Sequence, residues 1–214
     1  MTPQQLVIVG AGGHAREAFS VIAAINVLRL RWTVLGFTSI DAPHPDFLAR
    51  LGATWIGASE EVALRPRPRF VVAIGDAVTR QRVALRYESQ EMTPAALVHP
   101  SVVLGSGVSI GEGTIINQQV SISGGVAVGR HSYLNPATVL GADVSLGSGV
   151  SVNAAAKVLR GATVGSRTTL GVGCVIHPGV AIGSDVVVGA GAVVAFDVPD
   201  GVTVVGAPGR ILER

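Results

Sequence analysis

A glycine-rich turn near the start of the chain carries residues that could bind phosphate. Gln5 to Val9 is a short apolar run typical of a strand. The segment Gly10-Ala11-Gly12-Gly13-His14-Ala15 follows it, and helical spacing of apolar residues begins at Phe19. Free backbone N–H groups at a helix start bind anions, and glycine lets a ligand approach the backbone closely. We expect Gly12, Gly13 and His14 to contact a phosphorylated ligand, with the ordinary tight turn as the alternative.

A second group of candidate residues follows another apolar strand. Phe70 to Ile74 is such a strand, and Gly75, Asp76 and, one helical turn inside the next helix, Arg80 come after it. The carboxyl ends of parallel strands meet at one edge of a sheet, where open α/β sheets bind ligands. We therefore expect Ile74, Gly75, Asp76 and Arg80 to join the first group.

NAD is disfavoured as the ligand of this edge. A dinucleotide site needs an acidic residue at the end of the second strand to hold a ribose. Here the strand Thr33 to Phe37 is followed by Thr38 and Ser39, and Asp41 arrives late.

The second half of the chain is a repeat that must position the remaining chemistry. An aliphatic residue returns at every sixth position, and the residue two before each is small or β-branched. The residue after it is usually Gly or Asn, types that tolerate turns and positive φ. The aliphatic positions are Leu104, Ile110, Ile116, Ile122, Val128, Leu134, Leu140, Leu146, Val152, Val158, Val164, Leu170, Ile176, Ile182, Val188 and Val194.

This period predicts a left-handed parallel β-helix. Each hexad is one short strand and one corner, three hexads close a coil, and coils stack at about 4.8 Å. We expect about five coils, a ladder of Asn117, Asn135 and Asn153, and Cys174 as core filler. The domains expected are a Rossmann-like α/β domain over residues 1–95 and an all-β helix over residues 96–214.

Composition sets broad limits on function. The chain has 214 residues, 48% of them hydrophobic, a formal charge of +2 and a single cysteine. Arg65 to Arg69 is the one basic run and is interpreted as a loop, so no nucleic-acid partner is expected. With no signal-like segment and no long apolar run, we expect a cytoplasmic protein without a membrane partner.

The two halves together resemble the bacterial sugar O- and N-acetyltransferases of the sialic-acid and bacillosamine type. The features that carry the resemblance are Gly12-Gly13-His14, Ile74-Gly75-Asp76, Arg80 and the hexapeptide repeat. The resemblance implies an acetyltransferase that uses acetyl-CoA and no metal, acting on a UDP- or GDP-linked 4-amino-4,6-dideoxy sugar. It also implies a homotrimer and a role in bacterial glycan assembly such as O-antigen synthesis.

One residue departs from the family pattern. The segment from Asn135 to Asp143 matches the family's coil corner, where a His precedes an acid; here the acid is Asp143 and the His position is Ala142. The amine acceptor needs a base when it attacks the thioester, and Ala cannot supply one. Either the chain lost or relocated its base, or the residue was replaced to trap substrate. An isolated alanine in a retained motif favours replacement.

The resemblance also implies where the ligands bind. Asn135 would reach the sugar, and the cofactor would lie along Ser151, Val172, Ala190 and the exit loop Gly206, Ala207 and Pro208. Family members that hold UDP present paired acids after the second strand; Thr38-Ser39 departs from this, so GDP-perosamine is expected first and a UDP-linked sugar second.

The sequence leaves three rival functions. The first is O-acetylation of a free sugar such as sialic acid, and the second is a catalytically silent nucleotide-sugar-binding protein, which Ala142 suggests. The third, a zinc carbonic anhydrase on the same β-helix, needs three converging histidines. The repeat offers only His131 and His177, so it is disfavoured.

Overall fold

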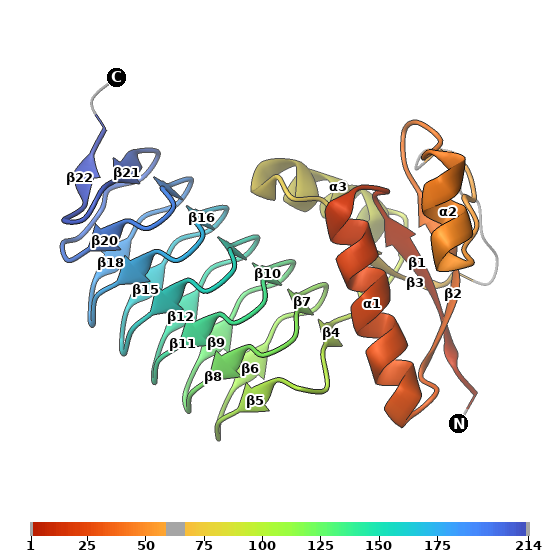
Figure 1. Ribbon diagram of the computed structural model, residues 1–214, viewed down its shortest axis with the longest axis horizontal. Coiled ribbons are helices and arrows are strands. Elements are labelled where there is room, and N and C mark those ends of the chain that lie inside the picture. The colour runs from red at the N-terminus through yellow and green to blue at the C-terminus, as the bar shows by residue number, and fades with distance from the viewer. Residues whose placement is uncertain (1, 59–66, 213–214) are drawn as a thin grey trace.

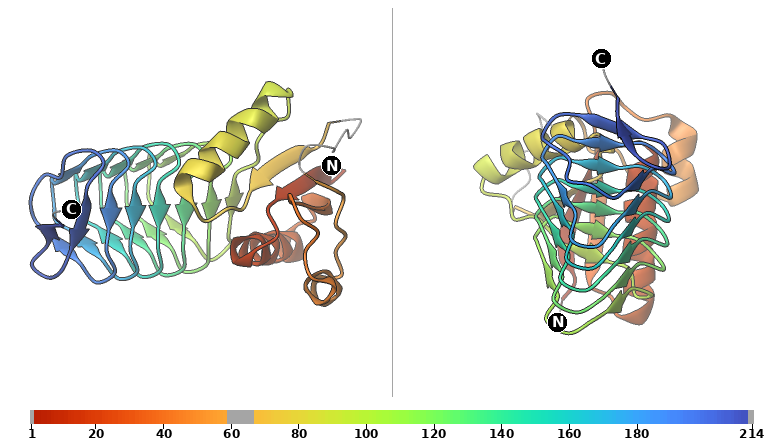
Figure 2. Two further views of the ribbon diagram at one scale, coloured as in Figure 1. Left: turned by 90° about the horizontal axis from the view of Figure 1, so that it is seen from above. Right: turned by 90° about the vertical axis from the view of Figure 1, so that its left-hand side faces the viewer.

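The structure is a computed structural model that describes residues 2–58 and 67–212. An α/β domain is followed by a stack of triangular coils (Figures 1 and 2). The basic run noted in the sequence lies partly outside the described residues, because Arg65 and Pro66 are not among them.

The N-terminal domain is a parallel sheet with two helices packed on one face and a third helix on the other. Its strands have the order β2-β1-β3, with β1 at Gln4–Val9, β2 at Trp32–Thr38 and β3 at Arg69–Val72. The helices α1 (Gly13–Leu28) and α2 (Pro45–Leu51) lie on one face, and α3 (Ala77–Ser89) lies on the other. Buried side chains of α1 share a core cluster with Leu6 and Ile8, and Ala84 and Tyr87 of α3 cluster with Val7 and Val9. Both faces of β1 are therefore apolar, as a central parallel strand requires.

The coil stack has three faces of two-residue strands. Neighbouring strands of one face are eighteen residues apart, as in the pairing of Leu134 with Val152. The first face holds β4 (Leu97–Val98), β7 (Ile115–Ile116), β10 (Tyr133–Leu134), β13 (Ser151–Val152), β16 (Thr169–Leu170), β19 (Val187–Val188), β21 (Thr203–Val205) and the antiparallel β22 (Arg210–Ile211).

The second and third faces contain the remaining strands. The second face holds β5 (Val103–Leu104), β8 (Ser121–Ile122), β11 (Val139–Leu140), β14 (Lys157–Val158), β17 (Val175–Ile176) and β20 (Val193–Val194). The third face holds β6 (Ser109–Ile110), β9 (Ala127–Val128), β12 (Ser145–Leu146), β15 (Thr163–Val164) and β18 (Ala181–Ile182). The left-handed parallel β-helix is confirmed, and its second face has six strands, one more than the five coils expected.

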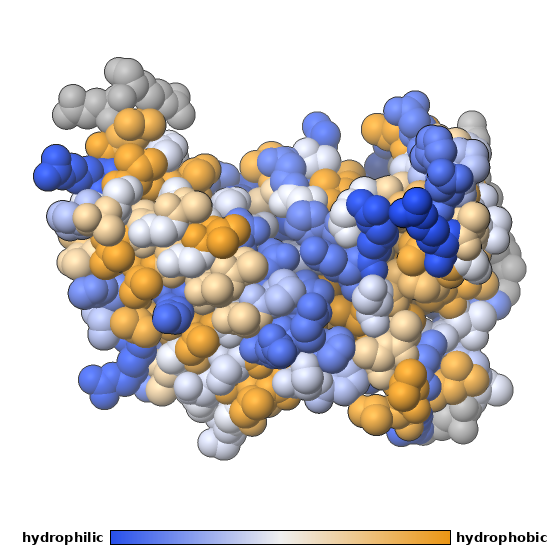
Figure 3. Space-filling model, in the orientation of Figure 1, coloured by the Kyte–Doolittle hydropathy of each residue, from blue (hydrophilic) through white to orange (hydrophobic). Residues whose placement is uncertain are grey.

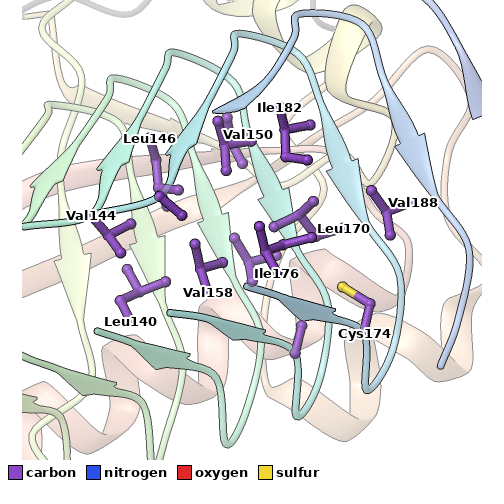
Figure 4. Close-up of a cluster of buried hydrophobic side chains, with 14 of the residues drawn as sticks. Leu140, Val144, Leu146, Val150, Val158, Leu170, Cys174, Ile176, Ile182 and Val188 are labelled. Atoms are coloured by element: carbon purple, nitrogen blue, oxygen red, sulfur yellow. The ribbon is translucent and has the colours of Figure 1, made fainter. Parts of the chain in front are cut away.

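The two columns of apolar residues form the core of the stack. Leu140, Leu146, Val158, Leu170 and Ile176 are among the side chains that point inward in Figure 4. The small-residue column supplies Val144, Val150 and Cys174. Cys174 is fully buried and burial raises the pKa of its thiol to about 12, so its role as core filler is confirmed.

The corners turn differently from the sequence expectation. The residue with positive φ stands three positions after the aliphatic, as in Gly107 and Asp143, and is often not glycine. The glycine directly after the aliphatic serves close packing instead, because a Cβ at Gly105 would overlap the backbone of Gly124 in the next coil.

The expected asparagine ladder is present. Nδ2 of Asn117 donates to Leu134 O at 3.2 Å, and Nδ2 of Asn135 donates to Asn153 Oδ1 at 3.2 Å. These amides therefore bond the backbone and one another from coil to coil, as expected for a stacked asparagine column.

The two halves share a core. Leu97, Ile115 and Tyr133 on the outer side of the first face pack with α1, while α3 lies along the corner between the third and first faces (Figure 2). Because α3 ends at Ser89 and β4 begins at Leu97, we keep residue 95 as the proposed boundary.

Candidate active site

The glycine-rich turn leaves the amino end of α1 open. Gly10 has a φ of +112°, and a Cβ there would lie 2.7 Å from Ala73 O, so only glycine fits. Gly12 is the N-cap of α1 and supplies no capping side chain. A Cβ on Gly12 or Gly13 would meet nothing within 4 Å. Open space therefore lies beside Gly12 and Gly13 at the amino end of α1, where an anionic ligand can approach the backbone.

A pocket lies at the carboxyl ends of the three strands. Val9 pairs with both Thr38 and Val72, so the strand ends are level. The pocket has a volume of about 460 Å³, and its lining includes Gly10 and Ala11 on one side and Ser39, Asp41, Ile74, Thr79 and Arg82 on the others. This places Ile74 beside the glycine turn, as expected from the sequence.

One buried hydroxyl in this pocket has no partner. Thr38 lines the pocket and is fully buried, and its Oγ1 makes no hydrogen bond within the described residues. A buried polar atom without a partner is costly, and a ligand that displaced the atoms covering Oγ1 would relieve that cost. From the sequence, Thr38 was noted only because it stands where a dinucleotide site would need an acidic residue. Thr79 and Arg82 were also missed, although they follow Asp76 at helical spacing.

His14 stands between the pocket edge and the coil stack. Its half-buried ring meets the ring of Tyr133 edge-on, with centroids 4.6 Å apart, and a Cβ on Gly75 would lie 2.9 Å from its Cε1. Tyr133 Oη donates to Glu17 Oε2 at 2.7 Å. Burial lowers the pKa of His14, with Glu17 opposing the shift. The imidazole is therefore neutral at pH 7.

Asp76 and Gly75 lie at the start of α3. Both residues are exposed, and Asp76 Oδ1 accepts the N–H of Thr79 at 2.7 Å as the N-cap of α3. Hydrogen bonds from the side chain and then the backbone of Thr79 lower the pKa of Asp76, so the carboxylate is ionised at neutral pH.

Arg80 and Ser151 bond each other inside the protein. Arg80 is 1% exposed, and its Nη2 donates to Ser151 Oγ at 2.8 Å. Ser151 is 4% exposed beneath the N-terminal domain. The sequence places these residues against two different ligands; in the structure both side chains are buried and bond each other.

Ala142 and Asp143 lie at the corner between the second and third faces. Ala142 is half-buried and Asp143 is exposed with a φ of +60°. This corner is opposite the first face, where the N-terminal domain packs. The glycine turn of one chain and Ala142 of that same chain are therefore not brought together.

The expected cofactor residues lie at a third place. Val172 and Ala190 are exposed, eighteen residues apart, at the corner between the first and second faces. The exit loop reaches the same end of the stack, where Gly206 O accepts the N–H of Val193 at 3.0 Å. Asn135 lies on the same corner, nearer the N-terminal end of the coil stack. Its side chain is 8% exposed, and its amide is hydrogen-bonded within the asparagine ladder.

The described residues contain neither a candidate metal centre nor a membrane-spanning helix. No group of three or more His, Cys, Asp or Glu is placed to hold a metal ion. No described helix is long and apolar enough to cross a membrane.

Comparison with known proteins identifies the two halves by sequence. Residues 5–87 match the PglD N-terminal domain family, and residues 161–195 match the bacterial transferase hexapeptide family. No curated protein matches the chain by sequence.

Solved structures match nearly the whole chain. PerB from Caulobacter crescentus, solved with CoA and GDP-perosamine, is 31% identical and has a TM-score of 0.89, with 98% of this chain and 97% of that chain covered. The acetyltransferase domain of PglB from Neisseria gonorrhoeae is 25% identical with a TM-score of 0.89, covering 98% and 100%. WeeI from Acinetobacter baumannii, at 22% identity, TM-score 0.75 and coverage of 97% and 99%, shares the fold.

The fold and the strand-edge pocket define the class of protein, an acetyltransferase built on a hexapeptide-repeat β-helix. Within that class, the chain belongs to the sugar N-acetyltransferase family with a PglD-type N-terminal domain.

Proposed function

We propose that this protein transfers the acetyl group of acetyl-CoA to the 4-amino group of a nucleotide-linked 4-amino-4,6-dideoxy sugar. The amine nitrogen attacks the thioester carbonyl, the C–N bond forms, the C–S bond breaks and the CoA thiolate leaves. The proton lost by nitrogen passes to a base and finally to the thiolate sulfur. GDP-perosamine is the first candidate substrate and a UDP-linked sugar is the second.

The observation that carries the proposal is the pocket beside the open glycine turn. The nucleoside would occupy the pocket, whose lining includes Thr38, the residue whose buried Oγ1 has no hydrogen-bond partner in the described structure. The diphosphate would bind the backbone N–H groups of Gly12 and Gly13 at the start of α1. The sugar would then extend over His14 toward Tyr133 and the coil stack.

The guanosine preference is supported from two sides. No acidic pair follows β2, since Thr38 and Ser39 stand at the strand end, and Asp41 is the one carboxylate among the pocket residues. PerB, 31% identical over nearly its whole length, was solved with GDP-perosamine. Both observations favour GDP over UDP.

Acetyl-CoA would lie along the corner between the first and second faces, toward the C-terminal end of the coil stack. Val172, Ala190 and the exit loop Gly206 to Pro208 line this exposed corner. CoA or acetyl-CoA is present in the solved structures of PerB and of the PglB domain.

A homotrimer would complete the site. The sugar pocket, Ala142 and the cofactor corner lie at different sides of one coil stack. A complete site would therefore combine these parts from neighbouring copies of the chain. Figure 3 shows apolar side chains gathered over the C-terminal coils, and Val172, Val187 and Phe196 are among the exposed apolar residues of these coils. Sedimentation of the protein as a monomer would contradict this arrangement.

Ala142 favours a second candidate, a protein that binds the sugar nucleotide and CoA without rapid transfer. A Caulobacter perosamine N-acetyltransferase in which one histidine is replaced by alanine was solved with both CoA and GDP-perosamine bound. Replacement of that histidine by alanine is therefore compatible with ligand binding in that protein, and we propose that Ala142 stands at the corresponding position in this chain.

The test is an acetyl-transfer assay of this chain with GDP-perosamine, a UDP-linked 4-amino sugar and free sialic acid. Transfer to the GDP-linked sugar supports the proposal, whereas transfer to sialic acid alone would move the function to O-acetylation. Binding of GDP-perosamine and CoA without transfer would support the silent protein.

A further inference from the structure

All five N–H groups of Arg80 donate hydrogen bonds to oxygen atoms, and these oxygens come from both domains. Toward the turn after β3, Nη1 donates to Ile74 O at 2.9 Å and to Gly75 O at 3.0 Å. Toward the coil stack, Nε donates to His131 O at 2.8 Å. Nη2 donates to Gly149 O and Ser151 Oγ, both at 2.8 Å.

These five acceptors are neutral, although the guanidinium is buried. Burial lowers the pKa of Arg80 to about 10, so the side chain remains charged at neutral pH. Burying a charge is expensive unless its hydrogen bonds are satisfied. A rigid, planar fork that satisfies five acceptors fixes the relative position of the groups that it bonds, which a flexible lysine cannot do.

In the N-terminal domain, the Arg80 guanidinium fixes the turn formed by Ile74, Gly75 and Asp76 at the edge of the pocket. In a planar trans peptide the C=O and N–H point in opposite directions. Because the carbonyls of Ile74 and Gly75 point at Arg80, the N–H groups of Gly75 and Asp76 point away from it. Gly75 also lies against the ring of His14, so the same turn sets the position of that ring.

In the coil stack, the same guanidinium fixes two successive coils. His131 and Gly149 are eighteen residues apart, at equivalent positions of stacked corners, and Ser151 lies in β13. Arg80 therefore joins the pocket edge to a defined level along the coil stack.

From this geometry we infer that Arg80 is a positioning residue, which sets the height of the sugar-nucleotide site along the β-helix without touching the ligand. The inference rests on the proposed function, because it concerns the site that holds the sugar nucleotide. It gives Arg80 an effect on sugar-nucleotide binding that a purely structural residue would not have.

The experiment is calorimetric titration of the full chain and its variants with GDP-perosamine and, separately, with CoA. In Arg80→Lys we expect sugar-nucleotide binding to weaken by about tenfold or more, because charge-assisted hydrogen bonds are lost. CoA binding should change by less than about threefold. Ser151→Ala removes one of the five acceptors and should weaken GDP-perosamine binding by about threefold, the low end for one lost hydrogen bond.

The matched control is Arg130→Gln. Arg130 Nη2 also joins the coil stack to α3, through Glu88 Oε1 at 2.7 Å, and the other carboxylate that it pairs with among the described residues is Glu112, which does not line the pocket. This variant should lower the melting temperature and leave both dissociation constants unchanged.

Outcomes separate this inference from the proposed function. If Arg80→Lys melts lower but binds GDP-perosamine like the parent, Arg80 is only structural and the inference is overturned. If Arg80→Lys does not fold, unchanged binding in Ser151→Ala overturns it. If the parent binds neither GDP-perosamine nor a UDP-linked 4-amino sugar, the proposed function itself falls and the inference falls with it.

Discussion

His131 Nε2 lies 2.8 Å from Glu88 Oε1, which joins a corner of the coil stack to the last turn of α3. The same carboxylate oxygen accepts Arg130 Nη2 at 2.7 Å. His131 is 4% exposed, and its Nδ1 is buried without a hydrogen-bond partner within the described residues. The contact between the domains thus contains a buried titratable group.

This contact predicts that mild acid destabilises the protein. Burial lowers the pKa of His131, against the opposing effect of Glu88 and with Arg130 and Arg80 adding to the shift. A histidine whose pKa is lower in the folded than in the unfolded chain binds fewer protons when folded, so acid favours unfolding. The stability is complete above about pH 6.5, the unfolded pKa, and is lost as the pH falls below it. Melting temperatures between pH 7.5 and 5.5 should show this decline.

Two histidine variants assign the effect. His131→Gln should flatten part of the decline below pH 6.5, and burial of His14 should account for another part, since its pKa is also lowered. His177 is exposed, so His177→Gln is the control for replacing a histidine outside this contact. An equal slope in His131→Gln and the parent would contradict the assignment.

Thr38→Val should separate ligand binding from stability. Because Thr38 Oγ1 has no partner in the described structure, its removal should leave the melting temperature unchanged or raise it. If a bound nucleotide supplies the partner, GDP-perosamine binding should weaken by about tenfold. Differential scanning fluorimetry and calorimetry measure the two effects.

Thr168→Val is the matched comparison. Thr168 Oγ1 donates to Gly183 O at 2.7 Å inside the coil stack, far along the chain from the pocket. That variant should lose stability and keep its affinity. The Thr38 interpretation is abandoned if Thr38→Val binds GDP-perosamine as tightly as the parent.

The fold was predictable from sequence because its signals are periodic. Sixteen aliphatic residues at one spacing define the β-helix, and the strand, glycine turn and helix define the first domain. The corner geometry was less accessible, since the spacing does not reveal that the residue three positions after the aliphatic takes positive φ. There, Ala137 and His131 adopt a conformation usually left to glycine.

Ala142→His should raise the rate of acetyl transfer by about 10²–10⁴, the scale of a general base. The imidazole would stand at the corner where the family pattern places it, next to Asp143. Turnover of acetyl-CoA and GDP-perosamine under saturation measures the change. A rate that does not rise would show that the chain lacks more than its base.

Ser166→His controls for an added histidine. Ser166 holds the equivalent position, two after the aliphatic, at the corner between the third and first faces. We expect no gain in rate there. A similar gain in both variants would mean that the histidine acts nonspecifically.

The candidate site was only partly accessible from sequence. Gly12, Gly13 and Ile74 could be proposed as site residues because strand ends and glycines carry a signal. Arg80 and Ser151 were each assigned to a ligand, since sequence cannot show that residues 71 positions apart bond each other in a buried contact. The unpartnered hydroxyl of Thr38 is likewise visible only once the sheet is formed around it.

The most direct test of the central claim is calorimetric binding of GDP- and UDP-linked 4-amino-4,6-dideoxy sugars to this chain with CoA present. The proposed function predicts that the GDP-linked sugar binds, and more tightly than the UDP-linked one, because Thr38 and Ser39 stand where an acidic pair would serve uridine. Binding of neither sugar nucleotide would contradict the claim and reduce the glycine-rich turn to an ordinary connection between strand and helix.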